Sequence, residues 1–418
     1  MDAASFDRAI VDHAAAIFLR YFSAPQPLDL DGPTLSMQRD RELLRLHWAL
    51  ASPVAFLASY VLEHRHEIQS VLTSAVRVED GVLRGRLNAA ATVMLRRRSG
   101  MATALVSNEP VRSYTSGPNQ VLGWVLMEAW SLASRFSSVT LDSAAYKSSI
   151  EHARQRLDQC RRLQSVAQIA GGTILNRRPT AAALSEASRS RRTVYRMATE
   201  AYHHLRKIEG GDPEAITTML RETMLGPLEP WRRFELAVGL SAGEALAAAQ
   251  DKPIVLNLLV GDAKRCLARS GNFAIYWQSR TEFYSAPELE PSEVIERRIL
   301  DAYGIAAGSD RPDLVIVDHG KNVVAAIVEV KYLTSEDATD RVKSAVSQIV
   351  RYARGYAKND NLEALIGVSV AVMSQGINDL SRSSLPTGVP TIADFAGLTQ
   401  QALAPWARSL CDGDQHVS

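Results

Sequence analysis

Two acids and a lysine stand at the ends of two apolar segments in the second half of the chain. Asp313 opens the first segment, and Glu329 and Lys331 close the second. A polar turn at 319–322 joins the segments, as in a β-hairpin. If the pairing is centred on Lys321, Asp313 and Glu329 lie opposite each other, about 5 Å apart. Lys331, two residues further along, then points to the same face of the sheet.

Two adjacent carboxylates in an apolar sheet repel each other and lose hydration, so a cation is expected between them. Mg²⁺, or Mn²⁺ in its place, binds one or two carboxylates and keeps positions for water and substrate phosphate oxygens. Asp313 and Glu329, with the Val330 carbonyl, are the candidate metal ligands. The Lys331 ammonium group can orient an attacking water or stabilise charge on the reacting phosphate. The pattern predicts metal-dependent phosphodiester hydrolysis.

A plainer interpretation is an edge strand whose Glu329 and Lys331 form an alternating polar face, with Asp313 as a cap at the start of its strand. An edge strand that faces water should be polar at every second position. Ala325 and Ile327, however, are expected on the face that carries Glu329 and Lys331. The charged pair is therefore expected at the end of a buried strand.

The spacing of these residues resembles a known nuclease signature. Pro312-Asp313, a gap of fifteen residues and then Glu329-Val330-Lys331 are similar to the PD-(D/E)xK motif, with glutamate at the second acidic position. Gln348 and Tyr352, four residues apart on one helix face, resemble the QxxxY element of RecB-like and Holliday-resolvase-like members. That likeness implies that both side chains support the site by positioning DNA or the lysine.

Nucleases of this kind usually take a further acid from a helix before the sheet. Glu235 is the preferred candidate for this catalytic and metal-binding role, because its helix precedes the first expected strand at 273–278. Glu296 is the alternative, although it lies between the first two strands. Either glutamate can equally be a solvated helix charge.

Three further segments resemble McrC-like nuclease subunits of 5-methylcytosine restriction systems. They are residues 82–87, residues 109–119 and the Phe234-Glu235 helix together with residues 276–278. The second segment departs from the family pattern, since Thr115-Ser116-Gly117-Pro118 stands where relatives often carry Asp-Thr-Pro-Glu. The resemblance implies a DNA endonuclease in defence against phage or other foreign DNA, with a partner NTPase. No GxxxxGK[ST] phosphate loop occurs in this sequence, so a partner has to supply NTP hydrolysis.

The elements that must position these residues suggest three domains. Residues 1–140 show helical periodicity at 9–22, 54–71 and 119–136, around a section with strand and turn character at 76–116; they are expected to form a domain that contacts a partner or DNA. Residues 141–225 read as a helical connecting bundle, and Pro227 and Pro230 mark a boundary near 226.

Residues 226–418 alternate helices and strands, the helices at 231–249, 292–303 and 338–356 and the strands at 273–278, 313–317, 323–332 and 364–373. The segment 253–269 reads as helical or extended. The fold class is therefore α+β and multidomain: a helix-rich N-terminal region is followed by an α/β domain with a central mixed sheet, resembling restriction endonucleases.

The bulk composition is that of a folded protein without export signals. Cys160, Cys266 and Cys411 stand far apart, which fits neither a disulfide framework nor a zinc site. The N-terminus lacks a signal-peptide pattern, and the apolar stretch 48–62 is too short to span a membrane and contains Pro53. A cytoplasmic location without membrane contact is expected, and homo-oligomerisation stays open.

A net charge of +1 gives no long-range attraction for DNA, so contacts must come from local basic patches. Four arginine clusters are candidates, at 96–98, 161–162, 177–178 and 189–192. The stretch 189–196 is preferred, because Tyr195 offers a ring for base stacking. Two other functions stay open: a catalytically idle subunit that regulates a motor NTPase, and a structure-specific DNA repair nuclease.

Overall fold

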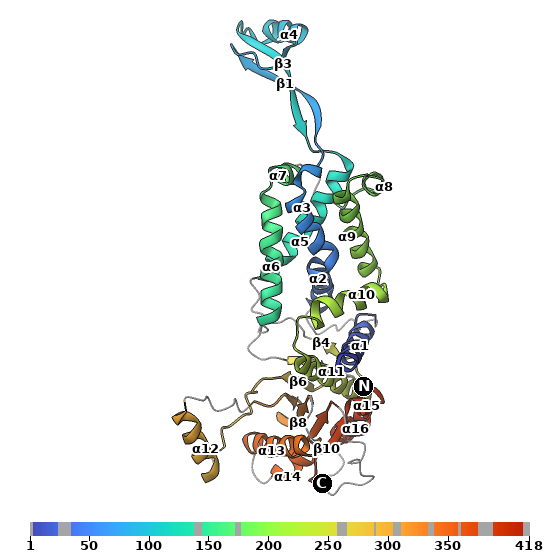
Figure 1. Ribbon diagram of the computed structural model, residues 1–418, viewed down its shortest axis with the longest axis vertical. Coiled ribbons are helices and arrows are strands. Elements are labelled where there is room, and N and C mark those ends of the chain that lie inside the picture. The colour runs from blue at the N-terminus through green and yellow to red at the C-terminus, as the bar shows by residue number, and fades with distance from the viewer. Residues whose placement is uncertain are drawn as a thin grey trace. The chain divides into compact units, whose positions relative to one another are not determined.

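The computed structural model groups the chain into two compact units (Figure 1). Unit 1 comprises Met1–Leu43, Val139–Lys147 and Gly211–Ser418, and unit 2 comprises Leu44–Ser138 and Ser148–Gly210. The structure describes residues 3–23, 35–137, 144–171, 177–256, 266–287, 290–303, 311–332, 338–357, 361–374 and 388–412. The three consecutive ranges expected from the sequence, 1–140, 141–225 and 226–418, do not coincide with these units, because the polypeptide passes between the units more than once.

Unit 1 is built on a mixed seven-stranded sheet in the order β10-β9-β8-β7-β6-β5-β4. The strands are β4 (Val255–Leu256), β5 (Cys266–Ser270), β6 (Phe273–Trp277), β7 (Leu314–Asp318), β8 (Val323–Lys331), β9 (Val370–Met373) and β10 (Thr391–Asp394). Neighbours from β4 to β8 are antiparallel, whereas β8, β9 and β10 run parallel. The α+β class and the mixed sheet expected from the sequence are confirmed.

Helices cover both faces of this sheet. The helices of unit 1 are α1 (Ala3–Ser23), α10 (Pro213–Leu220), the π-helical turn η2 (Arg221–Leu225), α11 (Pro230–Gln250), α12 (Pro291–Ala302), α13 (Ala338–Tyr356), α14 (Leu362–Gly367), α15 (Phe395–Thr399) and α16 (Leu403–Asp412). On one face, Tyr352 of α13 and Leu365 of α14 pack with Val315 and Ile327. On the other face, α11 packs against β5 and β6, with α16 beside it. The result is a three-layer arrangement with a buried central sheet.

Two glycines let α11 approach the sheet closely. A Cβ atom at Gly239 would lie 2.5 Å from Leu267 Cδ2, and one at Gly243 would lie 2.7 Å from Ile254 Cδ1. Both contacts are shorter than carbon atoms tolerate. Glu235 precedes Gly239 by four residues and therefore lies on the same helix face, one turn nearer the N-terminus.

The N-terminal helix α1 is packed into unit 1 by aromatic contacts. The Phe6 ring lies 6.3 Å from Phe234, 6.1 Å from Tyr332 and 5.3 Å from Phe395, measured between ring centroids. Phe234 directly precedes Glu235 and Tyr332 directly follows Lys331. This aromatic cluster (Phe6, Phe234, Tyr332, Phe395) therefore connects the helix that carries one acid to the strand that carries the lysine.

Unit 2 is a helical bundle with a long two-stranded ribbon. Its helices are α3 (Ser52–Glu63), the 3₁₀ turn η1 (Arg65–Glu67), α4 (Ala89–Ser99), α5 (Gly117–Ser137), α7 (Gln164–Ala170), α8 (Ala181–Ser188) and α9 (Thr193–Glu209), and its strands are β1 (Val71–Asp80), β2 (Arg86–Leu87) and β3 (Ala104–Ser113). Two more helices, α2 (Leu35–Leu50) and α6 (Ala144–Arg162), belong to it in their later parts. The ribbon β1–β3 leads away from the bundle helices and carries α4 at its far end (Figure 1).

Several expected elements differ from the observed ones. The helix expected at 54–71 ends at Glu63, and β1 begins at Val71. The strand expected at 364–373 is the helix α14 followed by the short strand β9, because the buried Leu365 packs from a helix instead of from the sheet. The expected segment 253–269 is β4 and β5 at its two ends, and its middle, 257–265, lies outside the described residues.

No helix in the described part of the chain has both the length and the apolar character that a bilayer crossing requires.

Candidate functional site

The register of β7 and β8 places the two strand acids level with each other. Leu314 pairs with Val328 and Val315 with Ile327, so Asp313 stands opposite Glu329. A bulge after Ile316 shifts the remainder of the pairing by one residue. Val324 therefore packs with the cluster that contains Ile327, the position that the alternation had assigned to Ala325. Without this shift the pairing next to the turn would place Asp313 opposite Val328, so the bulge brings the two acids level.

The main chain and the side chains lock this end of the hairpin together. The Val330 N–H donates a hydrogen bond of 2.8 Å to Asp313 Oδ2. Lys331 Nζ lies 2.5 Å from Glu329 Oε1, and it also donates to Gln348 Oε1. Asp313, Glu329, Val330, Lys331 and Gln348 thus form one connected group, and Gln348 positions the lysine.

Tyr352 lies on the same helix, one turn after Gln348, and supports the site by packing. It is only 4% exposed and lies in the cluster that contains Val315 and Ile327. Burial, followed by the charge of Glu329, raises the pKa of its hydroxyl to about 12. The ring is packed against the sheet, and the expected role of Tyr352 in positioning DNA or the lysine stays a prediction.

Glu235 reaches the same end of the sheet from α11. Its Oε2 accepts hydrogen bonds from Trp277 Nε1 (2.8 Å) and Gln278 Nε2 (2.6 Å), at the end of β6. The charge of Asp313 acts directly on this carboxyl group. Glu296 lies on α12, and its side chain is outside the described part of the structure. The structure thus brings Glu235 to the strand acids.

Gln278 is a positioning residue that the sequence did not reveal. Its backbone has a φ of 46°, in the left-handed region that non-glycine residues rarely adopt. Its N–H donates to the Asp313 carbonyl at 2.7 Å, and its Oε1 accepts from Arg311 Nη2 at 3.2 Å. Together with the bond to Glu235, these contacts connect the ends of β6 and α11 to the start of β7. Neither composition nor spacing carries a signal for such a conformation.

The three acids hold their protons unusually strongly. Burial, followed by the charge of Asp313, raises the pKa of Glu235 and of Glu329 to about 8. Burial also raises the pKa of Asp313, although the Val330 N–H and the Lys331 charge act in the opposite direction. These shifts are those expected of desolvated carboxyl groups that repel one another.

The donor set suits a hard divalent cation that keeps water or substrate in its shell. Glu329 Oε2 is buried and has no hydrogen-bond partner in the described part of the chain, and such an atom is stabilised by a cation. Among the described residues, no group of three or more His, Cys, Asp or Glu side chains is close enough to form a metal site by itself. Mg²⁺ needs only one or two carboxylates, whereas a structural zinc site needs four protein ligands.

The preferred basic stretch does not present a stacking ring. Tyr195 is fully buried in unit 2, where its hydroxyl accepts from the Gln69 N–H and donates to Asn119 Oδ1, both at 2.7 Å. The stacking role proposed for Tyr195 is therefore wrong, because its hydroxyl and ring belong to the bundle core.

Several arginines of the other clusters form ion pairs or hydrogen bonds with residues of unit 2. Arg178 pairs with Glu209 at 2.6 Å, and Arg161 and Arg162 both pair with Asp158. Arg96 Nε donates to the Ala104 carbonyl at 2.8 Å. These contacts explain part of the basic pattern without DNA.

Comparison with known proteins gives little further information. No protein family matches the chain, and no curated protein matches it. Among solved structures, a similar chain comes from the refined half-complex of the tetradecameric assembly of Thermococcus gammatolerans McrB AAA+ hexamers with bound McrC. The match covers 96% of this chain and 76% of that chain, with 12% identity and a TM-score of 0.26. A score this low does not establish a shared fold.

Proposed function

We propose that unit 1 is a metal-dependent deoxyribonuclease domain of the PD-(D/E)xK type, with its site at the ends of β7 and β8. The observation that carries the proposal is the register that sets Asp313 level with Glu329, whose buried carboxyl group contacts the Lys331 ammonium group at 2.5 Å. Burying the Glu329 carboxyl group in contact with the Lys331 ammonium group costs stability through desolvation. Groups with strongly shifted pKa values and a shared partner are typical of functional sites.

Asp313 and Glu329 are the groups that would hold Mg²⁺ or Mn²⁺, with Glu235 and the main chain at Val330 beside them. A bound divalent ion supplies a polarised phosphate oxygen and a water of lowered pKa. Metal binding requires the carboxylates in their charged form, so their raised pKa values make cation affinity dependent on pH.

The remaining residues hold and aim the charged groups. Gln348 accepts a hydrogen bond from Lys331 Nζ and so fixes the ammonium group next to Glu329. From there the ammonium can donate a hydrogen bond to a water or to a phosphate oxygen on which negative charge develops. Trp277 and Gln278 orient the Glu235 carboxyl group, and the buried Tyr352 supports the floor of the site.

We propose DNA as the substrate, and a restriction or defence role as the nuclease subunit of a system with a separate NTPase. This part of the proposal rests on the sequence motifs that resemble McrC-like subunits. Double-stranded DNA presents regularly spaced phosphates, and a site with one lysine and a divalent cation can neutralise the reacting one.

Cleavage of DNA by the purified protein tests the proposal. In the presence of Mg²⁺ or Mn²⁺, alone or with the products of neighbouring genes, wild-type protein should cut plasmid DNA. Lys331→Ala should lower the rate at least about 100-fold, because it removes the charge that stabilises the transition state. The matched control is Lys343→Ala, which changes an exposed lysine paired with Asp340 on α13. Equal cleavage by wild type and Lys331→Ala, or none by wild type under any of these conditions, refutes the proposal.

A further inference from the structure

A polar cavity lies in unit 2, at the root of the ribbon β1–β3. Its volume is about 590 Å³, within the range of small-molecule sites. Segments from η1, from both ribbon strands and from the start of α7 contribute to its wall. It is separate in the chain from every residue of the nuclease site.

The charged side chains that line this cavity are all basic. Arg65, His66 and Arg112 line it, and no Asp or Glu is among its lining residues. In the described part of the chain, neither arginine makes an ion pair with a carboxylate. The neighbouring acid, Glu67, is held within the bundle, where Oε1 accepts from the Tyr60 hydroxyl at 2.7 Å and Oε2 from the Val194 N–H at 3.2 Å. Two guanidinium groups therefore remain available for an anionic ligand.

The ribbon presents a consistent face to the cavity. Leu72 and Arg112 are direct partners in the antiparallel pairing of β1 and β3. Ser70 lies two residues before Leu72 and Tyr114 two residues after Arg112, both nearer the root of the ribbon. All four residues line the cavity. Because side chains alternate along a strand, this spacing places an apolar residue, an arginine, a hydroxyl and an aromatic ring side by side.

The wall is held in place before any ligand binds. Asn119 Nδ2 donates to the carbonyls of Gln69 (2.8 Å) and Tyr114 (3.1 Å), while the buried Tyr195 hydroxyl accepts from the Gln69 N–H. Arg192 Nη1 donates to the carbonyls of His66 and Glu67. A preformed wall lowers the entropy lost on binding.

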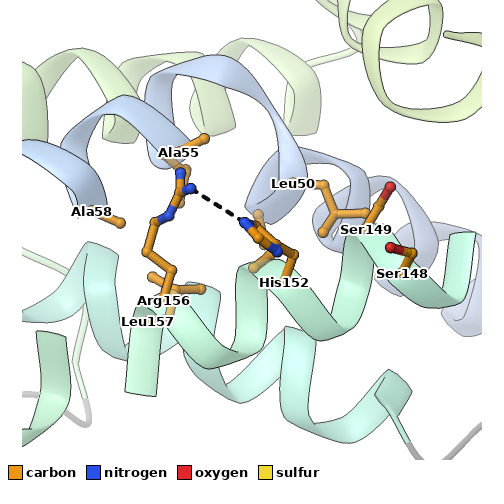
Figure 2. A pocket seen from close by; sticks show the side chains of 11 residues that line it. Leu50, Ala55, Ala58, Ser148, Ser149, His152, Arg156 and Leu157 are labelled. Atoms are coloured by element: carbon orange, nitrogen blue, oxygen red, sulfur yellow. Dashed lines mark hydrogen bonds between the residues drawn. The ribbon is translucent and has the colours of Figure 1, made fainter. Parts of the chain in front are cut away.

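Another cavity of unit 2, shown in Figure 2, lacks the available cations of the cavity at the ribbon root. It has a volume of about 300 Å³ and is lined mainly by small and apolar residues of α3 and α6, such as Ala55 and Ala58. Its arginine, Arg156, already donates to Ser59 Oγ at 3.0 Å and lies 3.5 Å from His152 (Figure 2). Of these two cavities, the one at the ribbon root combines available cations with space.

We infer that the cavity at the root of the ribbon binds a nucleoside phosphate. The Arg65 and Arg112 guanidinium groups match the geometry of phosphate oxygens. Tyr114 and Leu163 offer an aromatic and an apolar surface to a base, and Gln164 and Ser165 offer polar groups to its edge or to the sugar. This binding is independent of phosphodiester cleavage at the β7–β8 site.

Isothermal titration calorimetry of the full chain tests the inference. The probes are ATP, GTP, inorganic pyrophosphate and a ten-residue oligothymidylate, all with EDTA present, so that no metal can bridge a probe to the carboxylates of unit 1. We expect saturable binding of at least one nucleoside triphosphate that weakens as salt rises. Arg65→Ala and Arg112→Ala should each weaken it about tenfold or more, since each removes a charge-assisted hydrogen bond.

Arg97→Ala, which removes an exposed arginine on α4, is the matched control and should leave the affinity unchanged. Thermal unfolding of all three variants checks that the bundle is intact. Absence of saturable binding by both triphosphates at millimolar concentration overturns the inference. So does binding of the oligothymidylate alone, or nucleotide binding that survives the combined Arg65→Ala, Arg112→Ala change.

Discussion

At the scale of single residues, the candidate site joins groups that the sequence could and could not reveal. A turn centred on Lys321 predicts that Asp313 and Glu329 face each other, and the structure has them level, although the pairing next to the turn is offset by one residue. The likeness to a QxxxY element suggested that Gln348 positions DNA or the lysine, and in the structure Gln348 accepts a hydrogen bond from the lysine. The bulge after Ile316 and the left-handed backbone conformation of Gln278 could not be predicted, because backbone irregularities follow from tertiary packing.

The charge on Glu329 should make the metal-free protein less stable as the pH rises. The unfolded chain releases this proton near the ordinary value of 4.5, whereas the folded chain releases it at about 8. Between these values the folded state holds one more proton, so its stability falls as pH rises toward 8 and changes no further below 4.5. Glu329→Gln removes this penalty, and its stability gain over wild type should grow from pH 5.5 to pH 8.5.

Urea unfolding in EDTA at several pH values measures this difference. Glu363→Gln, at an exposed position on α14, controls for the loss of a surface charge and should show no such growth. A gain for Glu329→Gln that is the same at every pH contradicts the buried, protonated state of this carboxyl group.

Gln278 should act on catalysis through Glu235. Its hydrogen bond lowers the pKa of Glu235, so Gln278→Ala should shift the rising limb of the pH–rate profile to higher pH and slow cleavage. Gln278→Gly loses the same bond but relieves the left-handed backbone, so it should be about 1 kcal/mol more stable than Gln278→Ala. A pH–rate profile identical to that of wild type in both variants would show that Gln278 has only a structural role.

At the scale of elements, the site depends on α1, a helix that the sequence analysis placed in a separate N-terminal domain, 1–140. The periodicity of 9–22 predicted α1 correctly as a helix, but nothing local showed that Phe6 packs against Phe234 and Tyr332. Likewise, Leu365 belongs to an apolar run that suits either a strand or a buried helix, and tertiary packing selected the helix. Element type was therefore more predictable than element partners.

Phe6→Ala should destabilise unit 1 by about 3–5 kcal/mol, the usual loss for a buried phenylalanine. The matched control is Phe56→Ala on α3, because Phe56 is 65% exposed and should change stability little. Urea unfolding of both variants gives the comparison. Similar losses in the two variants contradict the role of the aromatic cluster.

At the scale of the whole molecule, the two units carry different chemistry. Unit 1 pairs Glu329 with Lys331 beside Asp313, and unit 2 carries a cationic cavity at the root of its ribbon. A division into consecutive ranges could not reproduce these units, because the chain contributes 1–43 and 139–147 to the unit built mainly from residues after 210. Such long-range assembly leaves no local mark in composition or periodicity.

The central claim, that the acids of unit 1 hold a divalent cation, is tested most directly by Mn²⁺ binding followed by electron paramagnetic resonance. Mn²⁺ suits the same carboxylate and water ligands as Mg²⁺. Wild-type protein should bind Mn²⁺ at pH 8 and release it as the pH falls to 6, because Glu235 and Glu329 take up protons over that range. Asp313→Asn should abolish this binding in a protein that remains folded. Mn²⁺ that stays free with wild type, or binds equally to Asp313→Asn, contradicts the account.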